Sequence, residues 1–126
     1  MKKQIVPLVV SFLGLLAVAC MGLVKSTESD RIRVLIIDGR NNHNWKDTTP
    51  FLKAQLEGTG KFEVSVATTP PNGAKAEDWN NFKPDFAKCD VVLSNYNGSK
   101  WEPESVRKSF ESFLNEGGAL VNVHAA

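Results

Sequence analysis

Residues 33–37 restrict the fold to one broad class. The run reads Arg-Val-Leu-Ile-Ile, one arginine followed by four branched aliphatic residues. Strands with one face in solvent alternate apolar and polar residues, whereas strands of parallel sheets are covered on both faces and are apolar throughout. The run therefore predicts a strand buried inside an α/β domain.

Strand-like and helix-like segments alternate after this run. Residues 61–68 alternate apolar and polar side chains, which predicts an edge strand. The full expected order is a strand at 33–37, a helix from Thr49-Pro50 to Gly58, a strand at 61–68, a weak helix at 78–87, a strand at 90–94, a helix from Pro103 to Gly117-Gly118 and a strand at 119–123. Strands joined through helices pair in parallel with right-handed crossovers. Because the second strand is edge-like, we expect the spatial order 2-1-3-4, a flavodoxin-like sheet with helices on both faces.

Local signals set the helix boundaries. Threonine caps a helix and proline is tolerated in the first turn, so Thr49 and Pro50 predict the start of the first helix. The last helix has the i, i+4, i+7, i+8 spacing of a single apolar stripe, formed by Val106, Phe110, Phe113 and Leu114.

The residues that could bind a ligand or take part in chemistry follow the strands. In open parallel sheets, ligands bind beyond the carboxyl ends of the strands, at the switch between the first and third strands. Both histidines of the chain are expected at this one rim. The first loop supplies Asp38, Gly39, Arg40, Asn41, Asn42, His43, Asn44 and Trp45, the second supplies Asn95, Tyr96, Asn97, Gly98 and Trp101, and His124 ends the fourth strand.

Several common occupants of such a rim are excluded by their motifs. The first turn, GRNNHN, lacks the G-x-G-x-x-G of dinucleotide binding, and the chain has no P-loop, no Ser/Thr-rich flavin loop and no G-x-S-x-G elbow. A glutamine amidotransferase of this architecture carries a nucleophilic cysteine where this chain has His124. Thiol chemistry at that position is therefore excluded.

Three segments, DGRNNHNWKDTTPFLKAQLEGTGKFEVSV, YNGSKW and EGGALVNVHAA, resemble the trehalose-utilisation (ThuA-like) family. The resemblance covers residues 31–126 and implies a class I glutamine amidotransferase-like fold without the cysteine. The matching positions are Gly39, His43, Trp45, Tyr96, Gly98, Trp101, Gly117, Gly118, His124, Ala125 and Ala126. Asn44 stands where the family leads us to expect aspartate.

Family members continue past this His-Ala-Ala. We therefore expect residues 31–126 to form the N-terminal half of a ThuA-like domain, truncated after its fourth strand. Such a sheet would expose an apolar edge.

The two histidines are the candidate catalytic residues. His124 and His43 could act as acid/base groups, since imidazole titrates near neutral pH. His124 could instead be a packed residue at a strand end, and His43 a solvated loop residue. Two imidazoles and a carboxylate also suit zinc, which makes His43, His124 and Asp38 candidate ligands of a divalent metal. Asp38 could equally close its strand by accepting hydrogen bonds from loop amides.

Aromatic and amide side chains are candidate substrate-binding residues. Trp45 and Trp101 could stack on a pyranose ring or cover helix starts as packing. Tyr96, Asn95 and Asn97 could hydrogen-bond a polyhydroxy ligand or form turns. The resemblance implies carbohydrate metabolism, so a small sugar is the expected ligand.

Three hypotheses on function remain open. The intact protein could be a sugar-processing hydrolase or lyase acting on trehalose or keto-sugar substrates. It could be a non-catalytic carbohydrate-binding or accessory module. The chain of 126 residues could also be an inactive gene fragment.

Residues 1–20 predict export. Two lysines, an apolar run and Ala17-Val18-Ala19 are typical of a signal peptide. Residues 16–20 resemble a bacterial lipobox, which makes Cys20 the lipidation site and residues 21–30 a polar tether. Cleavage after Ala19 without lipidation and an uncleaved anchor at 5–24 are the alternatives. Each predicts a periplasmic or cell-envelope bacterial protein, and two of them attach it to the membrane.

Charge and cysteine content exclude other classes. The formal net charge is +1 and no basic patch stands out, so nucleic acid is not an expected partner. With only Cys20 and Cys89, neither a disulfide framework nor a C-x-x-C metal site is expected. Cys89 precedes an apolar strand and is expected to be a buried, inert thiol.

Overall fold

The computed structural model describes residues 30–123. In chain order, the elements are β1 (Ile32–Asp38), α1 (Trp45–Gly58), β2 (Phe62–Thr68), the 3-10 helices η1 (Ala76–Asn81) and η2 (Phe86–Lys88), β3 (Val91–Ser94), α2 (Glu104–Asn115) and β4 (Ala119–Asn122).

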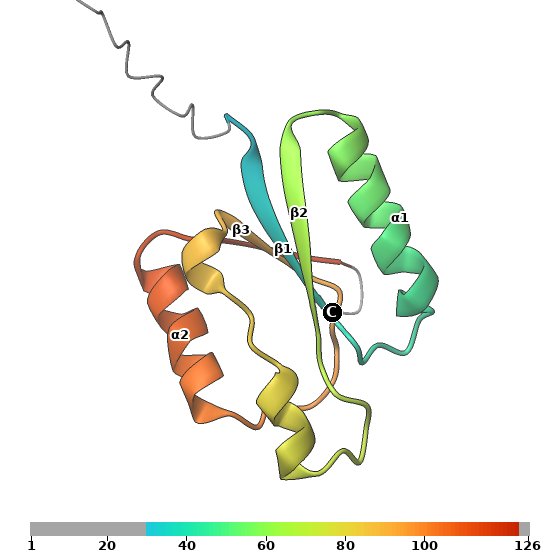
Figure 1. The fold of residues 1–126 in the computed structure, drawn as a ribbon, viewed down its shortest axis with the longest axis vertical. Coiled ribbons are helices and arrows are strands. Elements are labelled where there is room, and N and C mark those ends of the chain that lie inside the picture. Colours follow the sequence, from blue (N-terminus) through green and yellow to red (C-terminus); the bar gives the residue numbers. More distant parts are fainter. Residues whose placement is uncertain (1–29, 124–126) are drawn as a thin grey trace, which may run out of the picture.

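The strands form one parallel sheet in the order β2-β1-β3-β4 (Figure 1). Leu35 in β1 lies opposite Ser65 in β2 and Val92 in β3, and Val92 lies opposite Leu120 in β4. The α/β class, the parallel pairing and the 2-1-3-4 order predicted from the sequence are all confirmed.

Helices cover both faces of the sheet, because alternate residues of each strand point to opposite sides. Val34 and Ile36 pack with Val64 against α1, through Leu52 and Leu56. The other face carries a larger cluster to which β1, η1, η2, β3 and α2 contribute: Leu35, Ile37, Trp79, Phe82, Phe86, Cys89, Val92, Tyr96 and Phe113. Figure 1 shows α1 and α2 on opposite sides of the sheet. β1 therefore lies between two apolar layers, as its sequence predicts.

The first helix begins earlier than predicted. α1 starts at Trp45, and Pro50 lies inside it. The carbonyl of Asn44 accepts hydrogen bonds from the backbone N–H groups of Asp47 (3.2 Å) and Thr48 (3.0 Å), which forms a helical turn ahead of the proline. Thr49 is buried and its hydroxyl bonds a different loop, so it is no cap. The prediction of a start at Thr49-Pro50 was wrong.

The weak helix predicted for 78–87 is two separate 3-10 turns, η1 and η2. Pro84 lies between them, and proline inside a helix removes a donor and clashes with the preceding turn. Trp79 and Phe86 fix the two turns to the sheet, since both side chains are buried in the larger cluster.

The fourth strand is the least covered element of the sheet. All four residues of β4 are exposed, with Leu120 at 41% and Val121 at 51% of their full accessible area. Among residues 30–123, β3 is the only strand that pairs with β4.

Candidate functional site

The loops that follow β1 and β3 lie side by side at the carboxyl ends of the strands. The backbone N–H of Asn95 donates to the carbonyl of Ile37 (2.9 Å), and the N–H of Asn97 donates to the carbonyl of Arg40 (3.0 Å). These bonds continue the β1–β3 pairing beyond the sheet. They bring the two polar loops of the sequence to one rim.

His43 lies in a hollow of this rim. The hollow measures about 330 Å³ and is lined by His43, Thr48, Asn95 and Val123. It thus reaches from the first loop and α1 to the carboxyl end of β4. Parallel pairing therefore brings His43 beside the end of the fourth strand, which is the placement the sequence predicts for it.

A chain of amides and a hydroxyl supports the hollow from beneath. The His43 backbone N–H donates to Asn41 Oδ1 (2.9 Å), and Asn41 Nδ2 donates to Asn95 Oδ1 (3.1 Å) and to the Asn95 carbonyl (3.3 Å). Asn95 Nδ2 in turn donates to Thr49 Oγ1 (3.1 Å). Asn95 is 2% exposed, so its amide belongs to the buried framework of the rim and not to its solvated surface.

Two candidate sugar contacts lie close to this loop. Trp45 is the first residue of α1 and half-buried, with the Lys46 ammonium 5.8 Å from its ring centroid. Asn97 is exposed and its Nδ2 donates to Asn42 Oδ1 (2.5 Å). Both side chains remain partly accessible, and their roles stay predictions.

Tyr96 and Trp101 lie on the other side of the rim, in the aromatic cluster beneath α2. The Trp101 ring centroid is 5.4 Å from that of Phe110 and 5.5 Å from that of Phe82. The Tyr96 hydroxyl donates to the Ser99 carbonyl, and burial raises the pKa of this phenol. They line a separate hollow of about 250 Å³. The structure therefore does not bring Tyr96 and Trp101 into the hollow of His43.

Arg40 joins three loops of the rim. Its Nε donates to the Pro70 carbonyl (2.6 Å), Nη2 to the Pro71 carbonyl (2.8 Å) and Nη1 to Ser99 Oγ (3.0 Å). The side chain is 8% exposed. Because these hydrogen bonds go to the loops after β2 and β3, Arg40 holds the loops together, and we call this side chain the strap of the rim. The sequence showed the arginine but not its partners, which lie about 30 and 59 positions away.

Asp38 ends β1 as a buried carboxylate. It is 2% exposed, and its Oδ1 has no hydrogen-bond partner among the described residues, as is also true of Thr69 Oγ1. Its backbone carbonyl accepts from the N–H of Thr69 (2.9 Å). Thr69 packs on Gly39, where φ is +109° and an added Cβ would stand 2.5 Å from the Thr69 hydroxyl oxygen. The end of β1 is therefore held by the backbone hydrogen bond between Thr69 and Asp38 and by the close packing of Thr69 on Gly39. Among the described residues, no loop amide donates to Asp38 Oδ1.

No group of three potential metal-binding side chains occurs within residues 30–123. Of the three candidate ligands, His124 lies outside the described residues, as does the lipidation candidate Cys20. In the described part of the chain, no helix is both long and apolar enough to cross a bilayer.

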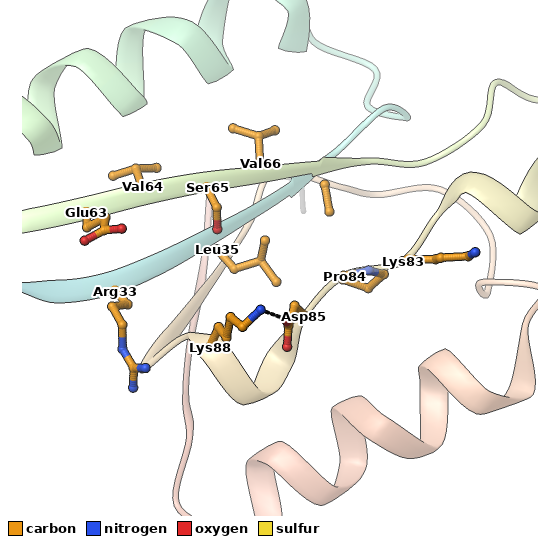
Figure 2. A pocket seen from close by; sticks show the side chains of 11 residues that line it. Arg33, Leu35, Glu63, Val64, Ser65, Val66, Lys83, Pro84, Asp85 and Lys88 are labelled. Carbon is orange, nitrogen blue, oxygen red and sulfur yellow. Dashed lines mark ion pairs between the residues drawn. The ribbon is translucent and has the colours of Figure 1, made fainter.

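Another hollow of about 340 Å³ lies between β2 and η2 (Figure 2). Apart from Lys83, its charged side chains are paired: Lys88 with Asp85 (3.0 Å), Arg33 with Asp90 (2.6 Å) and Glu63 with Arg31 (3.4 Å). We assign no site there, because most of these charges are already compensated and the hollow runs along the sheet edge, away from His43.

Comparison with known proteins supports the resemblance. No protein-family model matches the chain, and no curated protein matches it. A crystal structure of a protein from Parabacteroides merdae, described as ThuA-like, matches with a TM-score of 0.68 and 36% identity. The match covers 75% of this chain and 33% of that one, so this chain spans about a third of the length of its relative. The resemblance to the ThuA-like family, predicted from the sequence, is therefore confirmed by this match.

Proposed function

We propose that the protein binds a small neutral sugar, of the trehalose or keto-sugar type, in the hollow at the carboxyl ends of β1, β3 and β4, and acts on it there. The observation that carries this proposal is the placement of His43 and the buried Asn95 in one hollow at the switch point of the sheet. Ligands of open parallel sheets bind at that point. The similarity to a ThuA-like protein also supports a sugar ligand, because that family is named for trehalose utilisation.

The lining suits a neutral, polyhydroxylated ligand. It offers an imidazole, a hydroxyl from Thr48 and the apolar Val123, with the buried amide of Asn95 behind them. Hydroxyls and amides both donate and accept, which matches the hydroxyl groups of a sugar. The nearby arginine, Arg40, is bonded to Pro70, Pro71 and Ser99, so a strongly anionic ligand is disfavoured.

In this proposal His43 moves a proton to or from the sugar, with His124 as the second acid/base group immediately after Val123. Imidazole is suited to both directions of transfer near neutral pH. Trp45 supplies a stacking face, and Asn97 a hydrogen bond at the margin. Tyr96 and Trp101 contribute through the adjacent hollow, as a second contact region for a longer sugar.

A divalent metal held by His43, His124 and Asp38 is a second version of the same site. Asp38 favours it, because a buried carboxylate oxygen without a hydrogen-bond partner among the described residues is a ready oxygen donor. This version predicts that turnover falls with a chelator and returns with zinc. The metal-free version predicts no effect of the chelator.

Export completes the proposal. We place the domain, residues 31–126, in the periplasm or cell envelope of a bacterium, after a signal peptide at 1–20 and a tether at 21–30. Metabolic labelling with a radioactive fatty acid tests the lipid anchor: label on the wild type that is lost in Cys20→Ala supports it, and equal label on both contradicts it.

The test of the function is a sugar titration of the full chain, followed by calorimetry, with trehalose and a keto-disaccharide. We expect saturable binding that His43→Ala and Trp45→Ala weaken at least tenfold, and turnover that His43→Ala removes. Binding that both variants weaken, but without any turnover, would instead identify the non-catalytic accessory module. Equal affinity in the wild type and both variants would contradict the rim as the binding site.

A further inference from the structure

We infer that Asn95 is a positioning residue for His43, holding the His43 loop against the sheet through the side chain of Asn41. The inference concerns the structure of the site, and it rests on the proposed function only for what His43 does once it is in place. Asn95 lies at the carboxyl end of β3, more than fifty positions from His43 in the sequence.

The geometry supports a directed chain of hydrogen bonds. Asn95 is fixed to β1 by its own backbone N–H, which donates to the Ile37 carbonyl (2.9 Å). Its side-chain oxygen accepts from Asn41 Nδ2 (3.1 Å), and Asn41 Oδ1 accepts from the His43 N–H (2.9 Å). The imidazole-bearing residue is therefore tied to the rigid sheet through a single intervening side chain.

The amide of Asn95 matches both of its neighbours. The oxygen of Asn95 must accept from Asn41 while its nitrogen donates to Thr49 Oγ1 (3.1 Å). An amide provides an acceptor oxygen and a donor nitrogen on separate atoms, without a charge. Since Asn95 is 2% exposed, an apolar substitute would leave the hydroxyl of Thr49 without this partner and Asn41 Nδ2 with only the longer bond to the backbone carbonyl of residue 95 (3.3 Å).

The competing explanation is that Asn95 merely stabilises the whole domain. Hydrogen exchange separates the two, because it reports the opening of individual amides. The decisive quantity is the exchange rate of the His43 amide relative to that of Ile36, which lies fully buried in β1. A loss of global stability speeds the exchange of Ile36, which opens with the whole domain, and lowers the ratio, whereas a loss of positioning speeds the exchange of His43 and raises the ratio.

The experiment compares four variants of the full chain by NMR-detected exchange: Asn95→Leu, Asn41→Ala, the double variant and Val92→Ala. Val92 is the matched control, because it is buried in β3, the strand that Asn95 follows, and takes no part in the hydrogen-bond chain. We expect each rim variant to raise the His43-to-Ile36 rate ratio about fivefold, the effect of one lost hydrogen bond. The double variant should raise it no further, and Val92→Ala, which destabilises the core, should not raise it.

An unchanged ratio in Asn95→Leu, or effects that simply add in the double variant, would overturn the inference. If Asn95→Leu does not fold, Asn95→Ala takes its place, because it removes the same side-chain acceptor with a smaller side chain, and Asn41→Ala remains the comparison. The sugar titration is independent of this readout. A raised ratio without any sugar binding supports the positioning role and contradicts the proposed function. Sugar binding with an unchanged ratio supports the proposed function and contradicts the positioning role.

Discussion

The guanidinium carbon of Arg40 lies 4.9 Å from the centroid of the Trp79 ring. This contact connects the loop after β1 to η1, while the guanidinium nitrogens bond the loops after β2 and β3. One side chain therefore holds together the three loops on which the rim is built.

Replacement of Arg40 by methionine should destabilise the domain. The Pro70 and Pro71 carbonyls and the Ser99 hydroxyl would lose a charged donor in a mostly buried place, which costs about 2–3 kcal/mol of the free energy of unfolding. Urea denaturation measures this loss. The matched control is Arg31→Met, whose partner Glu63 is 58% exposed at its side chain, and it should change stability by no more than about 1 kcal/mol. Equal effects of the two variants would contradict the strap.

Gly98→Ala should disturb the rim through crowding. An added Cβ would stand 2.7 Å from the Tyr96 hydroxyl oxygen and 2.8 Å from Arg40 Cδ, so the phenol and the strap must shift, at a cost of about 1–3 kcal/mol. Gly58→Ala is the control, because nothing lies within 4 Å of its added Cβ at the end of α1. Thermal melts should show a lower midpoint for Gly98→Ala and an equal or higher one for Gly58→Ala. A midpoint unchanged by Gly98→Ala would mean that the contact is not tight.

The Arg33–Asp90 pair should give stability a small dependence on acid. Hydrogen bonds from the Arg33 guanidinium and backbone N–H lower the pKa of Asp90 to about 2, from the value of about 3.9 usual for aspartate. Because the folded pKa is depressed, the contribution is complete above about pH 4 and is lost as the pH falls towards 2. It amounts to about 1 kcal/mol or less, since both side chains are over 40% exposed.

Asp90→Asn measures this contribution. Its stability should lie below that of the wild type at pH 7, and the difference should shrink between pH 4 and pH 2. A difference that is constant over this range would show that the carboxylate charge plays no part.

Cys89 should resist thiol reagents in the folded protein. The side chain is buried beneath α2, and burial raises the pKa of the thiol to about 11, so little thiolate exists at neutral pH. In a Cys20→Ser background, a disulfide reagent at pH 8 should react slowly with the native chain and rapidly after denaturation in urea. Rapid reaction before denaturation would show that the cluster opens easily.

The sequence predicted those parts of the fold that depend on local pattern. The apolar run in β1 and the alternation in β2 were sufficient for the parallel sheet and its strand order. The capping argument failed at Thr49, because its hydroxyl bonds Asn95, a residue of another loop, and such a partner cannot be read from neighbours in the chain.

The candidate site was predicted in outline. The switch-point rule brought the loops of His43 and Asn95 together correctly. It could not separate the two sides of the rim, because Tyr96 and its neighbour Asn97 are adjacent in sequence but one is buried and the other exposed. Nor could it show that Asn95 is buried, since amides after a strand are equally common in solvated turns.

The uncovered fourth strand has a practical consequence for anyone who handles the protein. Leu120 and Val121 project from opposite faces of β4, and the far edge of β4 is unpaired in the described part of the chain. An unpaired apolar edge of this kind can pair with the same edge of another molecule. The protein should therefore self-associate in a concentration-dependent way. Dilution and mild detergent should reduce the association, and concentrated samples should aggregate.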